Sequence, residues 1–76
     1  MDHVTERITR VKNVFTYETV REDETDSTSF AYTETDPAYN FSMLARYAEY
    51  GLTELSYDPE TDTQVWEVTF TDYDYA

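Results

Sequence analysis

The hydrophobic pattern begins with a segment that fits two structures. Four hydrophobic residues recur at helical spacing near the amino terminus: Val4, Ile8, Val11 and Phe15. The last two of these share strand parity with Tyr17, in a stretch rich in Val and Thr, which favour strands. We therefore predict one long strand that ends near Val20 and has a bulge near Arg10. A short helix over residues 2–11 is the alternative.

A polar loop and a second strand follow. The sequence REDETDS at residues 21–27 predicts a loop, and TSFAYTET at residues 28–35 predicts a strand with Phe30 and Tyr32 on one face. The two predicted strands form an antiparallel hairpin.

The next segment has the start and stop signals of a helix. Asp36 is a good N-cap, Pro37 suits the first helical position, and Gly51 suits the left-handed C′ position. One predicted stripe contains Phe41, Leu44, Ala45, Ala48 and Leu52, and a neighbouring stripe contains Tyr39, Met43, Tyr47 and Tyr50. Because this apolar arc is wide for one helix, we expect one edge of it to face a partner or a second subunit.

After Gly51 the hydrophobic period changes to two, which predicts a second hairpin. Leu55 and Tyr57 share parity, DPETDT at residues 58–63 predicts a turn, and Trp66, Val68 and Phe70 alternate with their neighbours. The predicted fold is a small α+β domain of residues 1–76, an antiparallel sheet with one helix packed on it in the order ββαββ. We expect residues 1–3 and 72–76 to be frayed.

Composition adds a strong acidic bias. The net charge is −12, and residues 22–76 contain fourteen of the seventeen acidic residues but a single base, Arg46. Nucleic acids and anionic membranes are polyanions, so we expect neither as a direct partner, and we expect a basic protein instead. A homodimer is one further expected arrangement. No stretch is apolar enough for a leader or a bilayer span, which predicts a cytoplasmic protein, in the host cytoplasm if a phage encodes it.

The sequence contains no catalytic or cofactor-binding signature. It has one histidine, His3, no cysteine and a single glycine, so a nucleophile–base pair and a glycine-rich phosphate loop both lack candidates. The acids at 58, 60 and 62 have the spacing of the first EF-hand ligands, but Thr63 and Thr69 stand where that loop needs glycine and glutamate. We therefore expect no enzyme activity, no metal site and no cofactor.

The acidic residues repeat with a period of two in three groups, which places carboxylates on one side of an extended chain about 6.8 Å apart. Tyrosines between the acids add contact area that suits an interface. The candidate partner-binding residues are Glu18, Glu22, Asp23, Glu24, Asp26, Glu34, Asp58, Glu60, Asp62, Asp72, Asp74, Tyr47 and Tyr50.

Two functional interpretations follow from this surface. Small, strongly acidic, tyrosine-rich proteins of this kind resemble the DNA-mimicking inhibitors of phages and mobile elements, which block restriction enzymes, CRISPR effectors or uracil-DNA glycosylase. That resemblance implies a protein that occupies the nucleic-acid-binding cleft of such a target. The composition also resembles that of proteins from salt-loving cells, with one Lys against four Arg and a pI near 4.1. In that alternative, the aromatic face of the helix makes the interaction, as a homo-oligomer or an adaptor.

Overall fold

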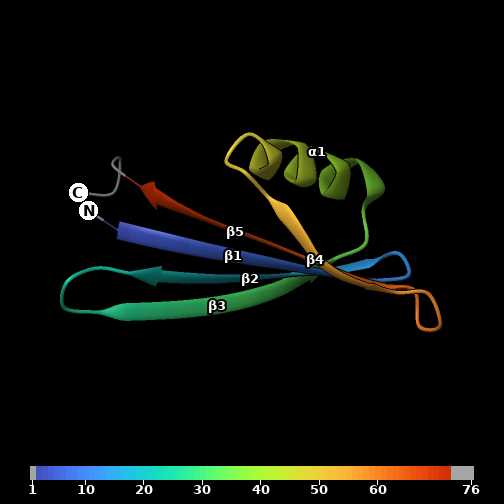
Figure 1. The fold of residues 1–76 in the computed structure, drawn as a ribbon, viewed down its shortest axis with the longest axis horizontal. Coiled ribbons are helices and arrows are strands. Elements are labelled where there is room, and N and C mark those ends of the chain that lie inside the picture. Colours follow the sequence, from blue (N-terminus) through green and yellow to red (C-terminus); the bar gives the residue numbers. More distant parts are fainter. Residues whose placement is uncertain (1, 73–76) are drawn as a thin grey trace.

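A computed structural model describes residues 2–72 of the chain. Its elements are β1 (Asp2–Val11), β2 (Val14–Glu22), β3 (Ser27–Glu34), α1 (Pro37–Ala48), β4 (Thr53–Asp58) and β5 (Thr63–Asp72). The strands form one antiparallel sheet in the order β3-β2-β1-β5-β4, and α1 lies over one face of it (Figure 1). The α+β class is confirmed, but the sheet has five strands and the chain order is βββαββ.

The additional strand comes from the amino-terminal segment, for which both predictions were wrong. Residues 2–22 form a tight hairpin in which Val11 pairs with Val14 across a two-residue turn. Such turns need positive φ, and Lys12 adopts a φ of 56° without being a glycine. The turn is held from outside, because the Lys12 N–H donates to the Asp62 carbonyl at 3.0 Å and the Arg10 guanidinium donates to the Lys12 carbonyl at 2.7 Å. The same hairpin includes residues 2 and 3 in β1, where we expected a frayed terminus.

The core lies between the sheet and α1. Strand β1 alternates strictly, with Val4, Glu6 and Ile8 buried on the helix side and the residues between them more exposed. Phe15 and Tyr17 of β2 join Ile8 in the central cluster. Full burial of one such apolar side chain contributes about 1.5–3 kcal/mol.

The side of α1 that meets the sheet differs from the predicted stripes. The inward residues are Asn40, Met43, Leu44 and Tyr47, which have the i, i+3, i+4, i+7 spacing of a helix face. Phe41, which we placed in the main apolar stripe, is 76% exposed. The prediction placed the aromatic Phe41 in the stripe that faces the sheet, whereas the structure buries its polar neighbour Asn40 there.

Asn40 takes that position because its polar atoms are satisfied. Its Oδ1 accepts a hydrogen bond from the Tyr17 hydroxyl at 2.5 Å, and its Nδ2 donates to the Glu34 carbonyl at 3.2 Å. Burial raises the pKa of Tyr17 to about 12, so its hydroxyl stays protonated and donates. This pair fixes α1 on β2 with specific geometry.

Both ends of α1 follow the sequence signals. The Asp36 carboxylate accepts from the Ala38 N–H at 3.0 Å, with Pro37 at the first helical position. Gly51 has a φ of 97°, and the N–H groups of Gly51 and Leu52 donate to the Ala48 and Tyr47 carbonyls, which is a Schellman motif. Within residues 2–72, no helix has the length and apolarity that a membrane crossing requires.

The second hairpin forms as predicted, with one irregularity. Glu54 pairs with Trp66 and Ser56 pairs with Val65, so Leu55 is an extra residue at a bulge. Leu55 is 52% exposed as a result. The bulge breaks the shared parity that the sequence indicated for Leu55 and Tyr57.

Candidate functional site

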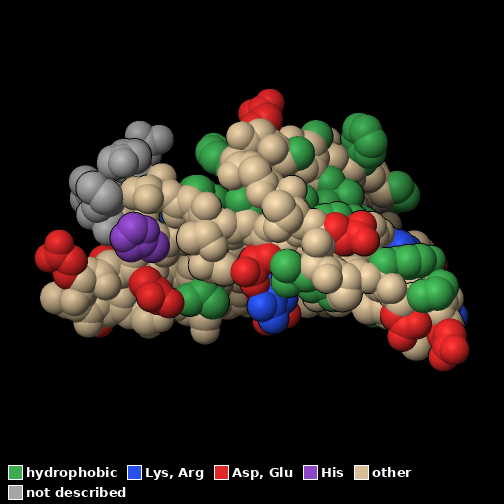
Figure 2. All heavy atoms as spheres, viewed as in Figure 1, with side chains coloured by type: hydrophobic (Ala, Val, Ile, Leu, Met, Phe, Trp, Pro, Cys, Tyr) green, Lys and Arg blue, Asp and Glu red, His purple; other side chains and the backbone are tan. Residues whose placement is uncertain are grey.

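The predicted acidic residues gather at two ends of an elongated molecule. The molecule measures 41 × 20 × 20 Å, with the turn between β2 and β3 at one end of the long axis and the turn between β4 and β5 at the other (Figure 1). Figure 2 shows acidic side chains at both ends, with others between them. The structure therefore places the two loop clusters at opposite ends of the molecule.

The turn between β2 and β3 contains one acid that is hydrogen-bonded within the turn, Asp23, and three further acids. The Asp23 carboxylate accepts from the N–H groups of Thr25 and Asp26, both at 2.7 Å, and these bonds lower its pKa. No side chain or N–H within residues 2–72 donates to the carboxylates of Glu22, Glu24 or Asp26. All three side chains are exposed to solvent.

The turn between β4 and β5 holds the second cluster. Asp62 accepts from the Arg10 guanidinium at 2.9 Å, and this contact lowers the pKa of the carboxyl group. Asp58 accepts from the Glu60 N–H at 3.0 Å and so shapes the turn. Glu60 is the one acid of this cluster whose carboxylate has no donor among the described residues.

The other predicted acids lie elsewhere. Glu18 is exposed on the uncovered face of the sheet, where it pairs in register with Arg7, and Arg7 in turn contacts Glu67 at 2.7 Å. Glu34 accepts from the Asp36 N–H at 3.1 Å, next to the start of α1.

Two further predictions fall at the carboxyl end of the chain. Asp72 ends β5 opposite Asp2, and only its backbone is described. Asp74 lies outside the described residues.

The two predicted tyrosines are wall residues of a cavity. Tyr47 is half-buried and packs on the core, while Tyr50 is half-exposed and stacks on Phe70 with ring centroids 4.6 Å apart. Both border a cavity of about 540 Å³ between α1 and the open end of the sheet. Its lining comprises Val4, Glu6, Thr19, Arg21, Phe30, Arg46, Tyr47, Tyr50, Phe70 and Thr71.

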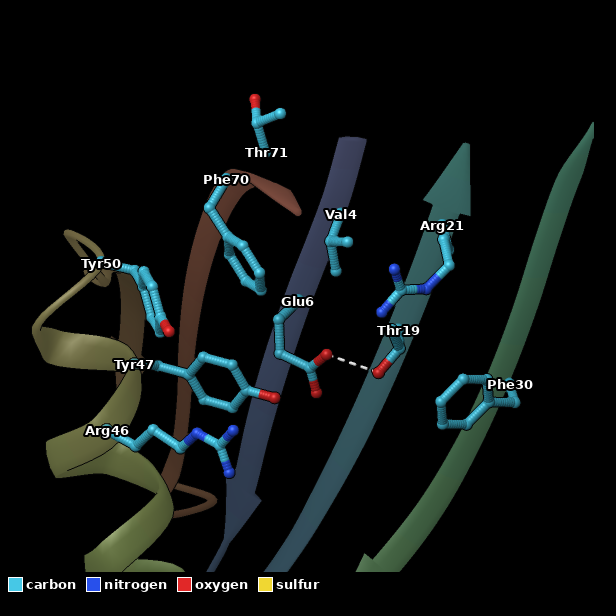
Figure 3. Close-up of a pocket in the computed structure, with 10 residues that line it drawn as sticks. All are labelled: Val4, Glu6, Thr19, Arg21, Phe30, Arg46, Tyr47, Tyr50, Phe70 and Thr71. Carbon is cyan, nitrogen blue, oxygen red and sulfur yellow. Dashed lines mark hydrogen bonds between the residues drawn. The ribbon is translucent and has the colours of Figure 1, made fainter. Parts of the chain in front are cut away.

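Glu6 lies at the floor of this cavity and was missed at the sequence level. Its side chain is 1% exposed, and its carboxylate accepts a hydrogen bond from the Thr19 hydroxyl (Figure 3). Burial raises the pKa of Glu6, and the Thr19 hydrogen bond opposes this only in part. The available signal was its position between Val4 and Ile8, two residues from each, on the buried face of a strand.

Two guanidinium groups enter the same cavity. Arg46 reaches in from α1 and Arg21 from β2, on opposite walls (Figure 3). Arg21 also contacts the Asp2 carboxylate at 3.4 Å. The cavity thus combines positive charge, aromatic surface and a buried carboxyl group in an otherwise acidic molecule.

The arrangement offers no shared ligand set for a metal. Among residues 2–72, no three acidic or histidine side chains are close enough together to hold one ion.

Comparison of the chain with protein-family models, curated proteins and solved structures finds no match. The chemistry of its own residues is therefore the basis for a function.

Proposed function

We propose that the protein is a non-enzymatic, DNA-mimic-like inhibitor that occupies the nucleic-acid-binding cleft of a DNA-processing or defence protein. The expected targets are restriction enzymes, CRISPR effectors and DNA glycosylases, and the expected source is a phage or a mobile element. The observation that carries this proposal is the set of exposed carboxylates at both ends of the molecule that accept no hydrogen bond from residues 2–72: Glu22, Glu24 and Asp26 at one end and Glu60 at the other.

The amount of charge supports a competitor for a DNA site. A duplex segment as long as this molecule, 41 Å, carries about 24 phosphate charges, at one charge per 1.7 Å. The protein has a net charge of −12, about half of that density. A cleft lined with Arg and Lys gains Coulomb energy and releases counterions on binding either surface.

The separation of the two acidic ends defines the expected target geometry. One end meets basic residues at one rim of a cleft, and the other end meets basic residues about 40 Å away. The middle of the uncovered sheet face contributes less negative charge, because Arg7 neutralises Glu67 there.

Competition with DNA tests the proposal directly. A type II restriction enzyme, an RNA-loaded CRISPR effector and a uracil-DNA glycosylase are each bound to a labelled duplex, and release is followed by fluorescence anisotropy. We expect the protein to displace DNA from at least one of them, with inhibition that weakens steeply between about 50 and 200 mM salt. Displacement of DNA from none of the three contradicts the proposal.

Charge reversal then locates the contact. The variant Glu24→Lys/Glu60→Lys changes one unpartnered acid at each end, and we expect at least a tenfold loss of inhibition. The matched control Glu49→Lys/Glu54→Lys makes the same change in net charge at two exposed residues outside the two turns, and we expect less than a threefold loss. Equal losses would show that net charge alone acts, without a docking geometry.

A second candidate function is favoured by the outer side of α1. Phe41 is 76% exposed there, which suits a homo-oligomer or adaptor in a salt-adapted protein. This candidate predicts a loss of the near-UV circular dichroism signal at low ionic strength, where the Debye length grows to about 30 Å. It also predicts that Phe41→Ser converts an oligomer into a monomer in analytical ultracentrifugation.

A further inference from the structure

The cavity between α1 and the sheet has a simple structural origin. Strand β1 has 10 residues and spans about 34 Å, whereas α1 has 12 residues and spans about 18 Å. The helix therefore covers only part of the face, and the uncovered part is walled by side chains of β2, β3, β5 and α1 (Figure 3). Its volume of about 540 Å³ lies within the range of about 300–1,000 Å³ that is typical of small-molecule sites.

The positive charge in this cavity is unusual for the chain. Arg46, the single base among residues 22–76, borders it. The ion pairs found within residues 2–72 involve Arg7, Arg10 and Arg21, and none of them includes Arg46. A guanidinium group binds carboxylate or phosphate with two parallel hydrogen bonds, so Arg46 offers an anion a docking group on the wall opposite Arg21.

The carboxyl group at the floor opposes this charge less than a solvated carboxylate would. Glu6 is enclosed, and burial raises its pKa, which favours the neutral acid. The raised pKa lessens the repulsion between Glu6 and a bound anion, and the Arg21 and Arg46 guanidinium groups face that anion from the two walls. Thr19 holds this group from the neighbouring strand.

The walls supply aromatic surface. Tyr50 and Phe70 are stacked on one side, and Phe30 of β3 lies on the other. Phe30 is 59% exposed, and its ring stacks on no other ring within residues 2–72. A planar ligand that covered Phe30 would remove this apolar surface from water and add an aromatic contact of about 0.5–1.5 kcal/mol.

We propose that this cavity binds a small aromatic anion, with its acidic group between Arg21 and Arg46 and its ring against Phe30 and Tyr50. Two kinds of molecule have this chemistry, a nucleoside monophosphate and an aromatic carboxylate. The cavity is separate from the acidic turns. If the cavity binds no ligand, the proposed inhibitor function still stands, and if the protein inhibits no DNA-binding target, the proposed ligand site still stands.

Titration calorimetry with four probes tests the ligand class. GMP and indole-3-acetate each combine a ring with an anionic group, whereas guanosine and inorganic phosphate each have one of these features. We expect GMP or indole-3-acetate to bind with a Kd below about 1 mM, and guanosine and phosphate at least tenfold more weakly. Whichever of GMP and indole-3-acetate binds more tightly shows whether the natural ligand is a nucleoside monophosphate or an aromatic carboxylate. Absence of binding by both, or equal binding by guanosine, overturns the proposal.

Variants of the lining locate the site. Arg46→Gln should weaken binding of the better probe at least tenfold, and because this side chain is exposed on α1, the variant should fold. The matched control Arg7→Gln removes the same charge from the uncovered sheet face and should change the Kd less than twofold. Near-UV circular dichroism checks the fold of both, and Arg46→Lys, with an intermediate affinity, replaces Arg46→Gln if that variant unfolds.

Glu6→Gln separates an anion site from a cation site. Glutamine keeps a neutral polar group at the floor, so we expect binding of the anionic probe to be retained or improved at pH 7. If Glu6→Gln abolishes binding while Arg46→Gln preserves it, the carboxylate is the docking group and the proposal is wrong.

Discussion

Ile8 and Glu6 are two residues apart on β1, lie on the same face of the sheet, and are equally hidden, at 0% and 1% exposure. Around Ile8 the face is densely packed, with Phe15 and Tyr17 in contact and α1 above. Around Glu6 the same face opens into a cavity that contains charged groups. One strand thus has a packed end and a hollow end, with the same alternation of inward and outward residues in both.

The difference between these ends indicates what each contributes. At the packed end, every buried group is apolar or has hydrogen-bond partners, so burial there stabilises the fold. At the hollow end, a carboxyl group is enclosed at a desolvation cost, and an apolar residue would fit the core better. A polar group that costs stability points to a role in binding.

The largest expected effect is at the packed end. Ile8→Ala should lower the free energy of unfolding by about 2–5 kcal/mol, because it removes a fully enclosed side chain and leaves a void. Urea titration followed by the fluorescence of Trp66 measures this. Val4→Ala, which borders the existing cavity, should cost less, and equal losses would remove the distinction between the two ends.

The second effect concerns the buried polar pair of the packed end. Tyr17→Phe should cost about 1–2 kcal/mol, because the Oδ1 of Asn40 loses the hydroxyl that donates to it at 2.5 Å. Tyr32→Phe is the matched control, since the Tyr32 hydroxyl bonds Tyr39 at the surface, and it should cost less than about 0.5 kcal/mol. Similar losses in the two variants would show that the buried hydrogen bond adds no stability.

The sequence was sufficient for the elements with strong local signals. The N-cap at Asp36 and the C′ glycine at Gly51 defined α1, and alternation of Trp66, Val68 and Phe70 defined β5. These features depend on neighbours within a few residues, so the chain itself contains the information.

The features that the sequence did not predict depend on contacts between residues far apart in the chain. The turn at Lys12 is held by the Asp62 carbonyl, fifty residues away, and the local signal there is Asn13 alone, without the glycine that marks the strongest two-residue turns. Asn40 is buried because Tyr17 reaches it from another element. The cavity results from the relative lengths of α1 and β1, which a local pattern does not encode.

A smaller effect, with opposite sign, is expected at the hollow end. Burial raises the pKa of Glu6 above its unfolded value, so the folded state holds this proton at pH values where the unfolded state has lost it. Stability from Glu6 is therefore full below the unfolded pKa and falls as pH rises through the folded pKa. Glu6→Gln should raise the free energy of unfolding at pH 7 by about 0.5–1.5 kcal/mol, because Thr19 keeps an acceptor and no charge is buried.

The control for Glu6→Gln is its own pH dependence. Urea titrations of both proteins from pH 3.5 to pH 8 should show the advantage of the variant disappearing toward acidic pH, below about 4.3. An advantage that stays constant with pH would mean that packing, and not the buried charge, separates the two proteins.

The smallest effect is expected at the exposed wall of the hollow end. Phe30→Ser should change the free energy of unfolding by less than about 0.5 kcal/mol, because Phe30 is 59% exposed in the folded state. Phe15→Ser is the matched comparison on the neighbouring strand, where the ring is 9% exposed and stacks near Tyr17 and Trp66, and it should cost several-fold more. Urea titration of both variants measures the two losses in the free energy of unfolding and so gives their ratio. A large loss in Phe30→Ser would make β3 a structural wall, whereas the expected small loss leaves Phe30 as a surface ring whose burial requires a bound molecule.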